Sequence, residues 1–195
     1  RSHPPIETVP SFRDGLFYIQ DPSTLLSVDL LNPKSGQAVL DLCAAPGGKT
    51  GLIAERMNNE GQLTATDTSD SRLGLLRENC ERLGVTCAAL GQAEAVLADA
   101  TPRFDQALVD VPCSNTGVMR RRLDLRWRIS AEETRYLTDT QLQLLARTAS
   151  LVRPGSALVY STCSIEPNEN GQIVKRFLEE NTGWQMETER TLHPV

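Results

Sequence analysis

A chain of 195 residues, of which 39% are hydrophobic and 23% charged, is long enough to bury the core of one domain. No apolar run approaches the roughly 18 residues of a membrane helix, and the polar start at residues 1–5 excludes a signal peptide there. The formal net charge of -5 argues against a nonspecific nucleic-acid binder, which is normally basic.

The cysteine and histidine content does not favour a structural metal or a disulfide framework. There are five cysteines with no CxxC pair, and the two histidines, His3 and His193, lie near the ends of the chain. This content fits reduced thiols in a cytoplasmic protein better. We therefore expect neither a metal site nor a membrane partner.

Segments with strand and helix patterns alternate along the chain, without an internal repeat. Ser130, followed three residues later by Glu133, has the pattern of a capping box at the start of a long helix. Helices are predicted over residues 25–31, 50–58, 69–83, 131–151 and 166–181. Strands are predicted over residues 38–42, 62–66, 85–90, 104–111 and 157–161, with a sixth starting at Trp184 to Glu189 and an ambiguous segment at 93–98.

This alternation predicts an α/β fold with a mostly parallel sheet that is covered by helices on both faces. In such sheets, ligands bind beyond the carboxyl ends of the strands. Asp67, Cys113 and Cys163 each follow a predicted strand closely, and so does a turn that contains Gly47 and Gly48. We therefore expect these groups to share one edge of the sheet.

The turn Asp41-Leu42-Cys43-Ala44-Ala45-Pro46-Gly47-Gly48-Lys49-Thr50 is typical of a cofactor cradle. Its glycines let a ligand approach the backbone, and the following helix presents free amides. Neither GxGxxG nor a P-loop fits, and Asp41 would repel a phosphate. A nucleoside with a cationic tail, such as S-adenosylmethionine, fits better, with Asp67 placed to bind ribose hydroxyls. A simple tight turn with a helix N-cap remains the alternative.

An arginine-rich segment begins a few residues after Cys113 and includes a tryptophan. Its expected place beside the site favours contacts with RNA phosphates and bases over a merely solvated loop. The candidate RNA contacts are Arg120, Arg121, Arg122, Arg126, Trp127 and Arg128.

Cys113, Cys163 and Asp110 suit methylation of carbon 5 of a pyrimidine. A thiolate that adds to carbon 6 makes carbon 5 nucleophilic, and a base must later remove the proton from carbon 5. An acid near N3 would stabilise the charge that develops, and each thiol would need a lowered pKa. The chemistry does not say which of the two cysteines attacks. The other three cysteines fit better as small buried side chains.

Several stretches of the chain resemble the Sun (RsmB, also called Fmu) family of RNA 5-methylcytosine methyltransferases. The turn that starts at Asp41 resembles the cofactor motif of that family. The segment Phe17-Tyr18-Ile19-Gln20-Asp21-Pro22-Ser23 resembles the part that leads into the domain. Asp110-Val111-Pro112-Cys113-Ser114 with Thr116-Gly117 resembles its proline-cysteine motif, and Ser161-Thr162-Cys163-Ser164 with Glu166 and Glu169-Asn170 resembles its threonine-cysteine motif.

The resemblance implies a Rossmann-like fold of S-adenosylmethionine-dependent methyltransferases and a role for each motif residue. Cys163 would be the nucleophile, Cys113 would assist product release and Asp110 would contact the cytosine ring. Lys49 would lie near the cofactor and the target base. Gln92 stands where the family often has an aspartate that contacts adenine. The cofactor would be held by Cys43, Ala44, Ala45, Pro46, Gly47, Gly48, Lys49, Asp67, Gln92 and Asp110.

Members of the family usually carry an N-terminal RNA-binding region and a final strand rich in glycine and phenylalanine, and neither pattern is found in this sequence. We therefore expect an N-terminal segment and helix over residues 1–35. A methyltransferase catalytic domain that lacks its last strand is expected over residues 36–195. Weak RNA affinity and impaired activity are expected as a result.

The resulting hypothesis is methylation of cytosine carbon 5 in RNA, with 16S ribosomal RNA as the expected substrate. The alternatives are another RNA such as tRNA, a DNA or small-molecule methyltransferase, and a noncatalytic RNA-binding module with the same fold. A DNA enzyme of this chemistry would use Cys113 as its nucleophile and leave Cys163 dispensable. A noncatalytic module would bind no S-adenosylmethionine.

Overall fold

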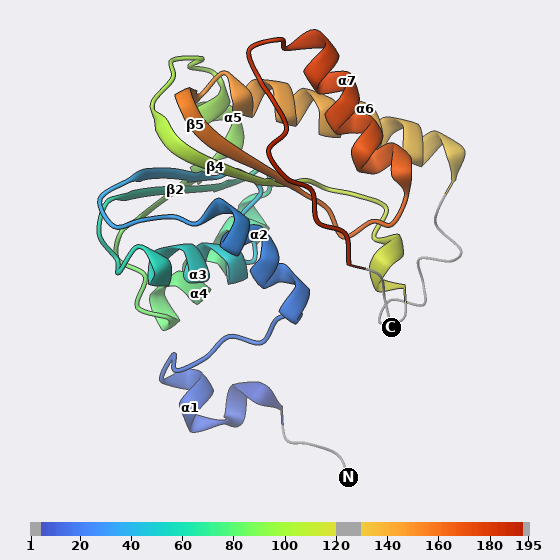
Figure 1. Cartoon of the computed structure of the whole chain (residues 1–195). Helices are drawn as coiled ribbons and strands as arrows, with labels where there is room; N and C mark the ends of the chain where they lie inside the picture. The colour runs from blue at the N-terminus through green and yellow to red at the C-terminus, as the bar shows by residue number, and fades with distance from the viewer. Residues whose placement is uncertain (1–4, 120–129, 193–195) are drawn as a thin grey trace.

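The structure is a computed structural model in which residues 5–119 and 130–192 are described. Within these residues, five strands form one sheet in the order β3-β2-β1-β4-β5, and all neighbouring strands pair in parallel (Figure 1). The predicted α/β fold with a parallel sheet is confirmed. The strands are β1 (Ala38–Asp41), β2 (Gln62–Asp67), β3 (Ala88–Gln92), β4 (Phe104–Asp110) and β5 (Val152–Ser161).

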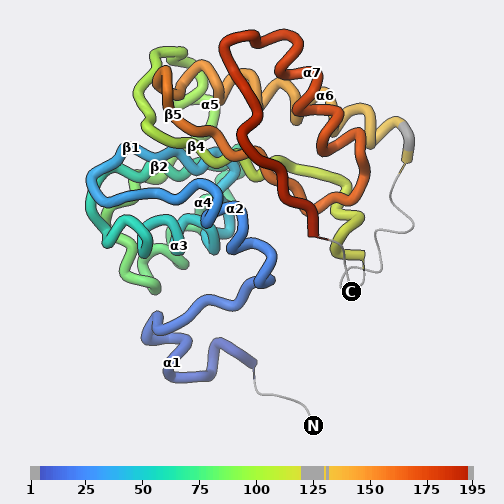
Figure 2. Tube along the Cα trace, in the orientation of Figure 1, coloured from blue at the N-terminus to red at the C-terminus, as the bar shows by residue number. Residues whose placement is uncertain are grey.

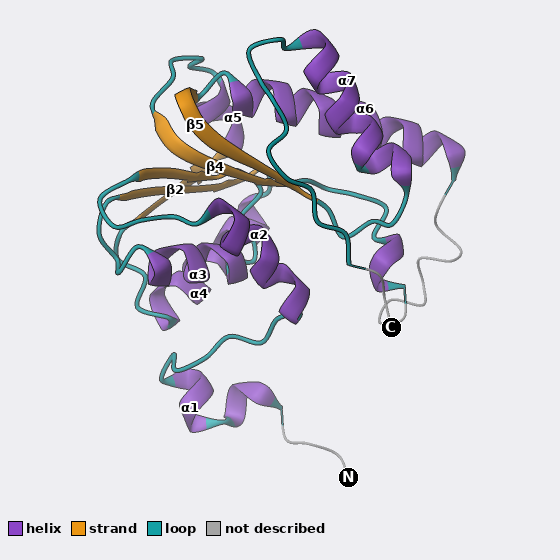
Figure 3. Cartoon of the chain, viewed as in Figure 1, coloured by secondary structure: helices purple, strands orange, loops and turns teal. Residues whose placement is uncertain are grey.

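Helices cover both faces of the sheet, with α2, α3 and α4 on one face and α5, α6 and α7 on the other (Figures 1 and 3). The ambiguous segment at 93–98 forms the short helix α5, and the predicted helix at 166–181 is divided into η5 and α7. The helices are α1 (Pro10–Arg13), α2 (Leu25–Leu31), α3 (Gly48–Arg56), α4 (Asp70–Arg82), α5 (Ala93–Leu97), α6 (Ala131–Ala149) and α7 (Gly171–Glu180), with single turns at η1 (Ile6–Thr8), η2 (Pro22–Thr24), η3 (Thr116–Val118) and η5 (Pro167–Glu169).

The core is divided into two layers by the alternation of side chains along the strands. Val39 and Leu108 are fully buried in one layer, together with α2 and α3. Leu40 and Ala107 are fully buried in the other layer, together with α5, α6 and α7. Each buried large aliphatic side chain contributes about 1.5–3 kcal/mol, so a shift of register by one residue would be costly.

The strand order reverses at β1, because β2 and β3 lie on one side of it and β4 and β5 on the other. At such a switch point the connections leave the sheet in opposite directions and open a crevice at the carboxyl ends of the strands. Asp41 ends β1 and Asp110 ends β4, so both carboxylates lie at this crevice. The topology therefore predicts a ligand site at this edge of the sheet.

β5 is longer than the predicted strand at 157–161, since it starts at Val152 and contains Pro154 and Gly155. The register with β4 shifts in this stretch, where Gly155 adopts a φ of 80°. A proline lacks the N–H that a ladder needs, but it is tolerated because β5 lies at the edge of the described sheet. Pro154 and Gly155, which predict a turn before the strand, therefore lie inside an irregular part of β5.

The prediction of a strand at Trp184 to Glu189 is wrong, since this segment has no strand in the structure. The Trp184 ring packs edge-to-face on Phe177 of α7, with ring centroids 6.0 Å apart. Met186 and Glu189 line a groove against the same helix, along which the chain runs back (Figure 2). Side-chain packing on α7 holds this segment in place of backbone pairing with a strand.

The N-terminal segment packs against the C-terminal end of α4. The Arg82 guanidinium donates to the carbonyl oxygens of Phe12 at 2.8 Å and Phe17 at 3.1 Å. It also lies 3.9 Å from the centroid of the Phe12 ring, as a cation–π contact. α2, which lies before residue 35, packs into the core on one face of the sheet. The predicted division of the chain at residue 35 stays a prediction. Among residues 5–119 and 130–192, no helix combines the length and apolar character that crossing a membrane requires.

Candidate active site

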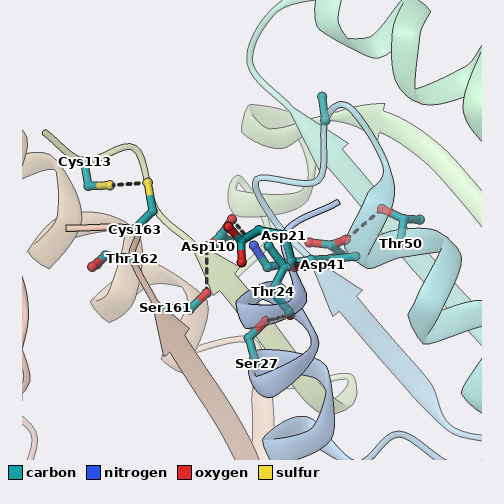
Figure 4. Close-up of polar contacts among 12 residues, drawn as sticks. Asp21, Thr24, Ser27, Asp41, Thr50, Asp110, Cys113, Ser161, Thr162 and Cys163 are labelled. Carbon is teal, nitrogen blue, oxygen red and sulfur yellow. Dashed lines mark hydrogen bonds and ion pairs between the residues drawn. The ribbon is translucent and has the colours of Figure 1, made fainter. Parts of the chain in front are cut away.

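Cys113 and Cys163 face each other beyond the carboxyl ends of β4 and β5 (Figure 4). Their Sγ atoms lie 3.2 Å apart, although 50 residues separate them in the chain. Cys113 follows β4 and is buried, whereas Cys163 follows β5 and is exposed. Because β4 and β5 are parallel neighbours, their carboxyl ends bring both loops to one edge of the sheet. The structure thus contains the convergence of thiols that the topology predicted.

Asn115 links the two cysteine loops. Its side-chain amide donates to the Cys113 carbonyl oxygen at 2.7 Å, and its Oδ1 atom accepts from the Cys163 thiol at 2.9 Å. Gly117 adds a second link, since its N–H donates to the Cys163 carbonyl oxygen at 3.0 Å. A Cβ at Gly117 would lie 2.7 Å from that oxygen, so only glycine permits this approach of the two loops.

The two thiols differ in acidity. The Cys163 thiol directs its one proton toward both Asn115 Oδ1 and the Cys113 sulfur, and the contact with Cys113 lowers the pKa of Cys113 by more than burial raises it. The same contact raises the pKa of Cys163, and partial loss of water around its sulfur adds to the rise, although the residue reaches the surface. The expected lowering of the pKa is therefore found for Cys113 alone, because two sulfur atoms at this distance share one proton more readily than they carry two charges.

An ion pair lies next to the thiols. Lys49 Nζ lies 2.5 Å from Asp110 Oδ2. The Ser161 hydroxyl donates to Asp110 Oδ1 at 2.6 Å (Figure 4). Asp110 raises the pKa of Cys163 and Lys49 lowers it, so both charges act on the thiol. Because Lys49 reaches from the first turn of α3 to the end of β4, the pair spans the crevice.

Asp41 at the end of β1 is fully buried. Thr50 donates its hydroxyl hydrogen to Asp41 Oδ2 at 2.7 Å, while Oδ1 has no hydrogen-bond partner among the residues that the structure describes. Burial raises the pKa of Asp41 to about 6, against the lowering effects of the Thr50 hydroxyl and Lys49. A buried carboxylate oxygen without a partner is costly, and it suits a site that receives a donor or a cation from a ligand.

The glycine turn follows β1 and starts α3. Gly47 adopts a φ of 108°, a conformation that favours glycine. Gly48 is crossed closely by the N-terminal segment, since a Cβ there would lie 2.6 Å from the Tyr18 ring and 2.7 Å from Gln20 Oε1. The second glycine therefore makes room for Tyr18 and Gln20, a contact between distant segments that the sequence reasoning missed.

Asp67 is buried and holds the glycine turn. Its Oδ2 atom accepts from the Ala45 N–H at 3.3 Å and forms an ion pair with Arg72 at the same distance. Its Oδ1 atom accepts from the Thr68 N–H at 2.9 Å. Gln92 pairs with Asp67 in the register of β2 and β3, and its amide donates to Asp70. Both side chains lie at the expected edge, and the ribose and adenine contacts stay predictions.

The other three cysteines differ from this pair in their surroundings. Cys80 is buried in the core under α4, and burial raises its pKa to about 11. Burial likewise raises the pKa of Cys43 to about 12 and raises the pKa of Cys87. These thiols are kept in the protonated, unreactive form, which agrees with their expected structural role.

Residues 28–195 match the family described as 16S rRNA methyltransferase RsmB/F. The match extends over well above half of the chain. The chain belongs to this family. The resemblance that the sequence motifs indicated is thereby confirmed, and the RsmB/F family is one of ribosomal RNA methyltransferases by its description.

Relatives of the RsmB/F chain agree with this assignment. The probable ribosomal RNA small subunit methyltransferase B of Bacillus subtilis is 39% identical over 177 residues, which are 89% of this chain and 40% of the relative. Ribosomal RNA small subunit methyltransferase B of Vibrio cholerae is 40% identical over 182 residues, again 89% of this chain and 40% of the relative. The chain thus spans about two fifths of the length of these curated relatives.

A solved structure supports the fold of this RsmB/F chain. NSun6 from Pyrococcus horikoshii, crystallised with SFG, has a TM-score of 0.83 and 32% identity, covering 91% of this chain and 46% of NSun6. The predicted Rossmann-like fold of S-adenosylmethionine-dependent methyltransferases is confirmed. The expected cofactor, S-adenosylmethionine, agrees with membership of a methyltransferase family.

The structure describes only some of the residues that the sequence motifs indicate. The candidate RNA contacts Arg120, Arg121, Arg122, Arg126, Trp127 and Arg128 lie outside the described residues. The sequence motifs assign no role to Asn115 and include Ser161 only as part of the threonine-cysteine motif, although both contact a predicted site residue. Their signal was position alone, since each lies within two residues of a motif cysteine.

Proposed function

We propose that the chain methylates carbon 5 of cytosine in RNA, with Cys163 adding to carbon 6 of the base and S-adenosylmethionine as the methyl donor. The observation that carries the proposal is the pair of thiols 3.2 Å apart, next to the ion pair of Lys49 and Asp110. The family description supports 16S ribosomal RNA as the substrate. Reduced thiols are needed for this chemistry, which is consistent with a cytoplasmic location.

The exposure of the thiols supports a division of roles. Cys163 is exposed, so a base that enters from solvent meets its sulfur first, whereas Cys113 is buried behind it. As Cys163 adds to carbon 6, its proton passes to solvent, to which this residue is exposed, and Cys113, whose pKa is lowered, stays a thiolate. After methylation, Cys113 as a thiolate takes the proton from carbon 5, and the bond between Cys163 and carbon 6 breaks.

Asp110 and Lys49 orient the base and balance its charge in this proposal. Addition of a thiolate to carbon 6 places negative charge on the ring, and the Lys49 ammonium, which has N–H donors beyond the one bonded to Asp110, would stabilise that charge. Lys49 holds Asp110 from one side and the Ser161 hydroxyl holds it from the other. Two partners fix the carboxyl group in one orientation, which is what recognition of a flat ring requires.

The crevice fits a cationic nucleoside in three respects. Asp41 offers a buried oxygen without a partner among the described residues, and the turn from Cys43 to Gly48 joins the carboxyl end of β1 to the start of α3, where a nucleoside would be held. Asp67 and Gln92 line the adjacent strand ends, where a ribose and an adenine would lie. SFG, with which NSun6 was crystallised, is an analogue of S-adenosylmethionine. When bound, this cofactor supplies the methyl group that cytosine carbon 5 receives.

The target cytosine must leave its stack to admit a thiol above its plane, so a loop or a flipped base is the proposed target. The arginines at 120, 121, 122, 126 and 128 and the tryptophan at 127 would contact its flanking phosphates and bases. Another RNA such as tRNA would fit the same chemistry, so tRNA is a second candidate substrate.

Separate replacement of the two cysteines tests the proposal. In the presence of S-adenosylmethionine and 16S ribosomal RNA, Cys163→Ala is expected to form no covalent protein–RNA adduct, whereas Cys113→Ala is expected to accumulate one. Cys87→Ala serves as the control, because this thiol lies away from the pair and should leave adduct formation as in the wild type. tRNA and DNA are assayed in parallel.

The opposite pattern, an adduct that requires Cys113 and survives the loss of Cys163, would reverse the roles and favour the DNA-type reaction. Calorimetry addresses the noncatalytic alternative, because a methyltransferase must bind S-adenosylmethionine. Absence of binding by the chain and of any methyl transfer to the RNAs would contradict the proposal.

A further inference from the structure

Glu169 is a fully buried carboxylate that the proposed mechanism does not use. It ends η5, six residues after Cys163, and four hydrogen bonds are donated to it. Oε1 accepts from the Ser114 N–H and from the Gln141 side-chain amide, both at 2.9 Å. Oε2 accepts from the Ser164 hydroxyl at 2.5 Å and from the Ser114 hydroxyl.

The donors come from the two cysteine loops. Ser114 directly follows Cys113, and Ser164 directly follows Cys163. Glu169 therefore bridges the residues next to the two thiols, and the hydroxyls of Ser114 and Ser164 also lie 3.1 Å from each other. A change in the place of this carboxylate would move both loops relative to one another.

Two further hydrogen bonds hold the residues of this bridge in place. Gln141 of α6 is fully buried, and its amide also donates to the carbonyl oxygen of Pro112, the residue before Cys113. The Tyr160 hydroxyl donates to the backbone carbonyl oxygen of Glu169 at 2.6 Å. The bridge is thus anchored to a long helix and to β5, which are rigid elements of the fold.

Burial of a carboxylate costs several kcal/mol unless hydrogen bonds offset the loss of water. An apolar side chain of similar size would fill the same space without this cost, so stability alone does not explain a glutamate here. We propose that Glu169 is a positioning residue that sets the separation of the Cys113 and Cys163 sulfur atoms. The assignment rests on the proposed function, since it assumes that both thiols act on one base.

The polarity of the hydrogen bonds gives a matched pair of variants. Oε1 faces two groups that can only donate, the Ser114 N–H and the Gln141 amide, whereas Oε2 faces two hydroxyls that can also accept. Glu169→Gln can therefore keep its oxygen at Oε1 and donate from its nitrogen to the hydroxyls. Glu169→Ala removes all four bonds and leaves the loops unlinked.

The test measures the thiols without RNA or cofactor. Phenylarsine oxide condenses with two neighbouring thiols to form a cyclic adduct and releases water, and it binds weakly to a single thiol. Its affinity for the whole chain is measured by competition with a monothiol, with Cys163→Ala as the blank that lacks the pair. Wild type and Glu169→Gln are expected to bind alike, and Glu169→Ala about tenfold or more weakly, because the second thiol no longer lies within bonding reach.

Circular dichroism and thermal unfolding establish whether Glu169→Ala is folded at the temperature of the assay. If it is not, Ser114→Ala with Ser164→Ala removes the two hydroxyl bonds to Oε2, and with them the link to the Cys163 loop, and leaves Oε1 bonded to Gln141 and to the backbone N–H of residue 114. A folded variant of either kind that keeps the wild-type affinity for the arsenical overturns the proposal, as does a Glu169→Gln chain as weak as Glu169→Ala.

Methyl transfer separates this inference from the proposed function. If wild type methylates cytosine and folded Glu169→Ala does so at the same kcat, Glu169 has no positioning role while the function stands. If arsenical binding depends on Glu169 but no variant and no wild-type chain methylates RNA, the bridge stands and the proposed function fails.

Discussion

The ammonium group of Lys49 lies 2.5 Å from the carboxylate of Asp110, which comes 61 residues later in the chain. The two side chains are only 16% and 31% exposed. Lys49 lies in the first turn of α3 and Asp110 ends β4, so the ion pair joins the first and fourth strands at the place where the topology predicts a ligand. The pair therefore joins the glycine turn to the cysteine loops.

Asp110→Asn should lower kcat/KM for RNA methylation by about 10²-fold while the fold is retained. The amide keeps the shape of the side chain but cannot carry the charge that holds Lys49, and Lys49 is then free to leave the crevice. Steady-state methyl transfer with labelled cofactor measures the effect.

Arg56→Gln provides the control for this prediction. It breaks the ion pair of Arg56 with Asp29, which has a 2.8 Å separation but side chains about half exposed. Surface pairs of this kind contribute at most about 1 kcal/mol, so kcat/KM should stay unchanged. An equal loss in Asp110→Asn and Arg56→Gln would show that the crevice pair has no special role.

Cys163→Ala should raise the pKa of Cys113 toward the ordinary thiol value of about 8.5. The hydrogen bond from Cys163 lowers the pKa of Cys113, and alanine has no donor. A smaller fraction of Cys113 is then ionised at neutral pH, so the midpoint of alkylation by iodoacetamide moves to higher pH. Mass spectrometry of the Cys113 peptide gives the midpoint, and Cys163→Ser, which keeps a donor, should shift it less. A midpoint unchanged in the alanine variant would refute the shared proton.

Asp41 should make the ligand-free fold less stable as the pH rises from about 4 to about 6. Burial raises its folded pKa to about 6, above the unfolded value of about 3.9, so the folded state binds more protons in this range. The group destabilises the fold by about 1–3 kcal/mol above pH 6, relative to pH 4.

The measurement is the free energy of unfolding by urea at several pH values, for wild type and Asp41→Asn. The asparagine does not titrate, so the difference between the two chains isolates the slope that Asp41 causes. Curves that run parallel from pH 4 to pH 7 would contradict the raised pKa.

Gly47→Ala should destabilise the fold by about 1–3 kcal/mol and weaken S-adenosylmethionine binding. The φ of 108° strains any residue with a Cβ, and the added methyl would lie 2.9 Å from the Leu76 side chain. Gly74→Ala is the matched control, because Gly74 lies inside α4 with nothing within 4 Å of its Cβ position. The control should gain about 0.5–1 kcal/mol from better helix formation. Urea unfolding and calorimetry report both effects, and equal behaviour of the two variants would exclude a special turn conformation.

The secondary structure could be predicted from local patterns wherever one face of an element is buried. Leu73, Leu76 and Cys80 are spaced along one side of α4 and are buried in the structure. The prediction failed where local signals misled, as at Trp184, where an apparent strand packs by its side chains on α7. Pro154 and Gly155 suggested a turn, but an edge strand absorbs both residues.

The sequence by itself determined the parallel sheet, the edge where a ligand is expected and the presence of two cysteines there, because side-chain periodicity and the alternation of strands with helices can be read from local segments. Only the tertiary structure decided which polar groups meet at that edge. The ion pair of Lys49 with Asp110, the link through Asn115 and the buried bridge of Glu169 join residues far apart in the chain. Such contacts depend on distances of a few ångströms between separate loops, and no spacing along a single segment encodes them.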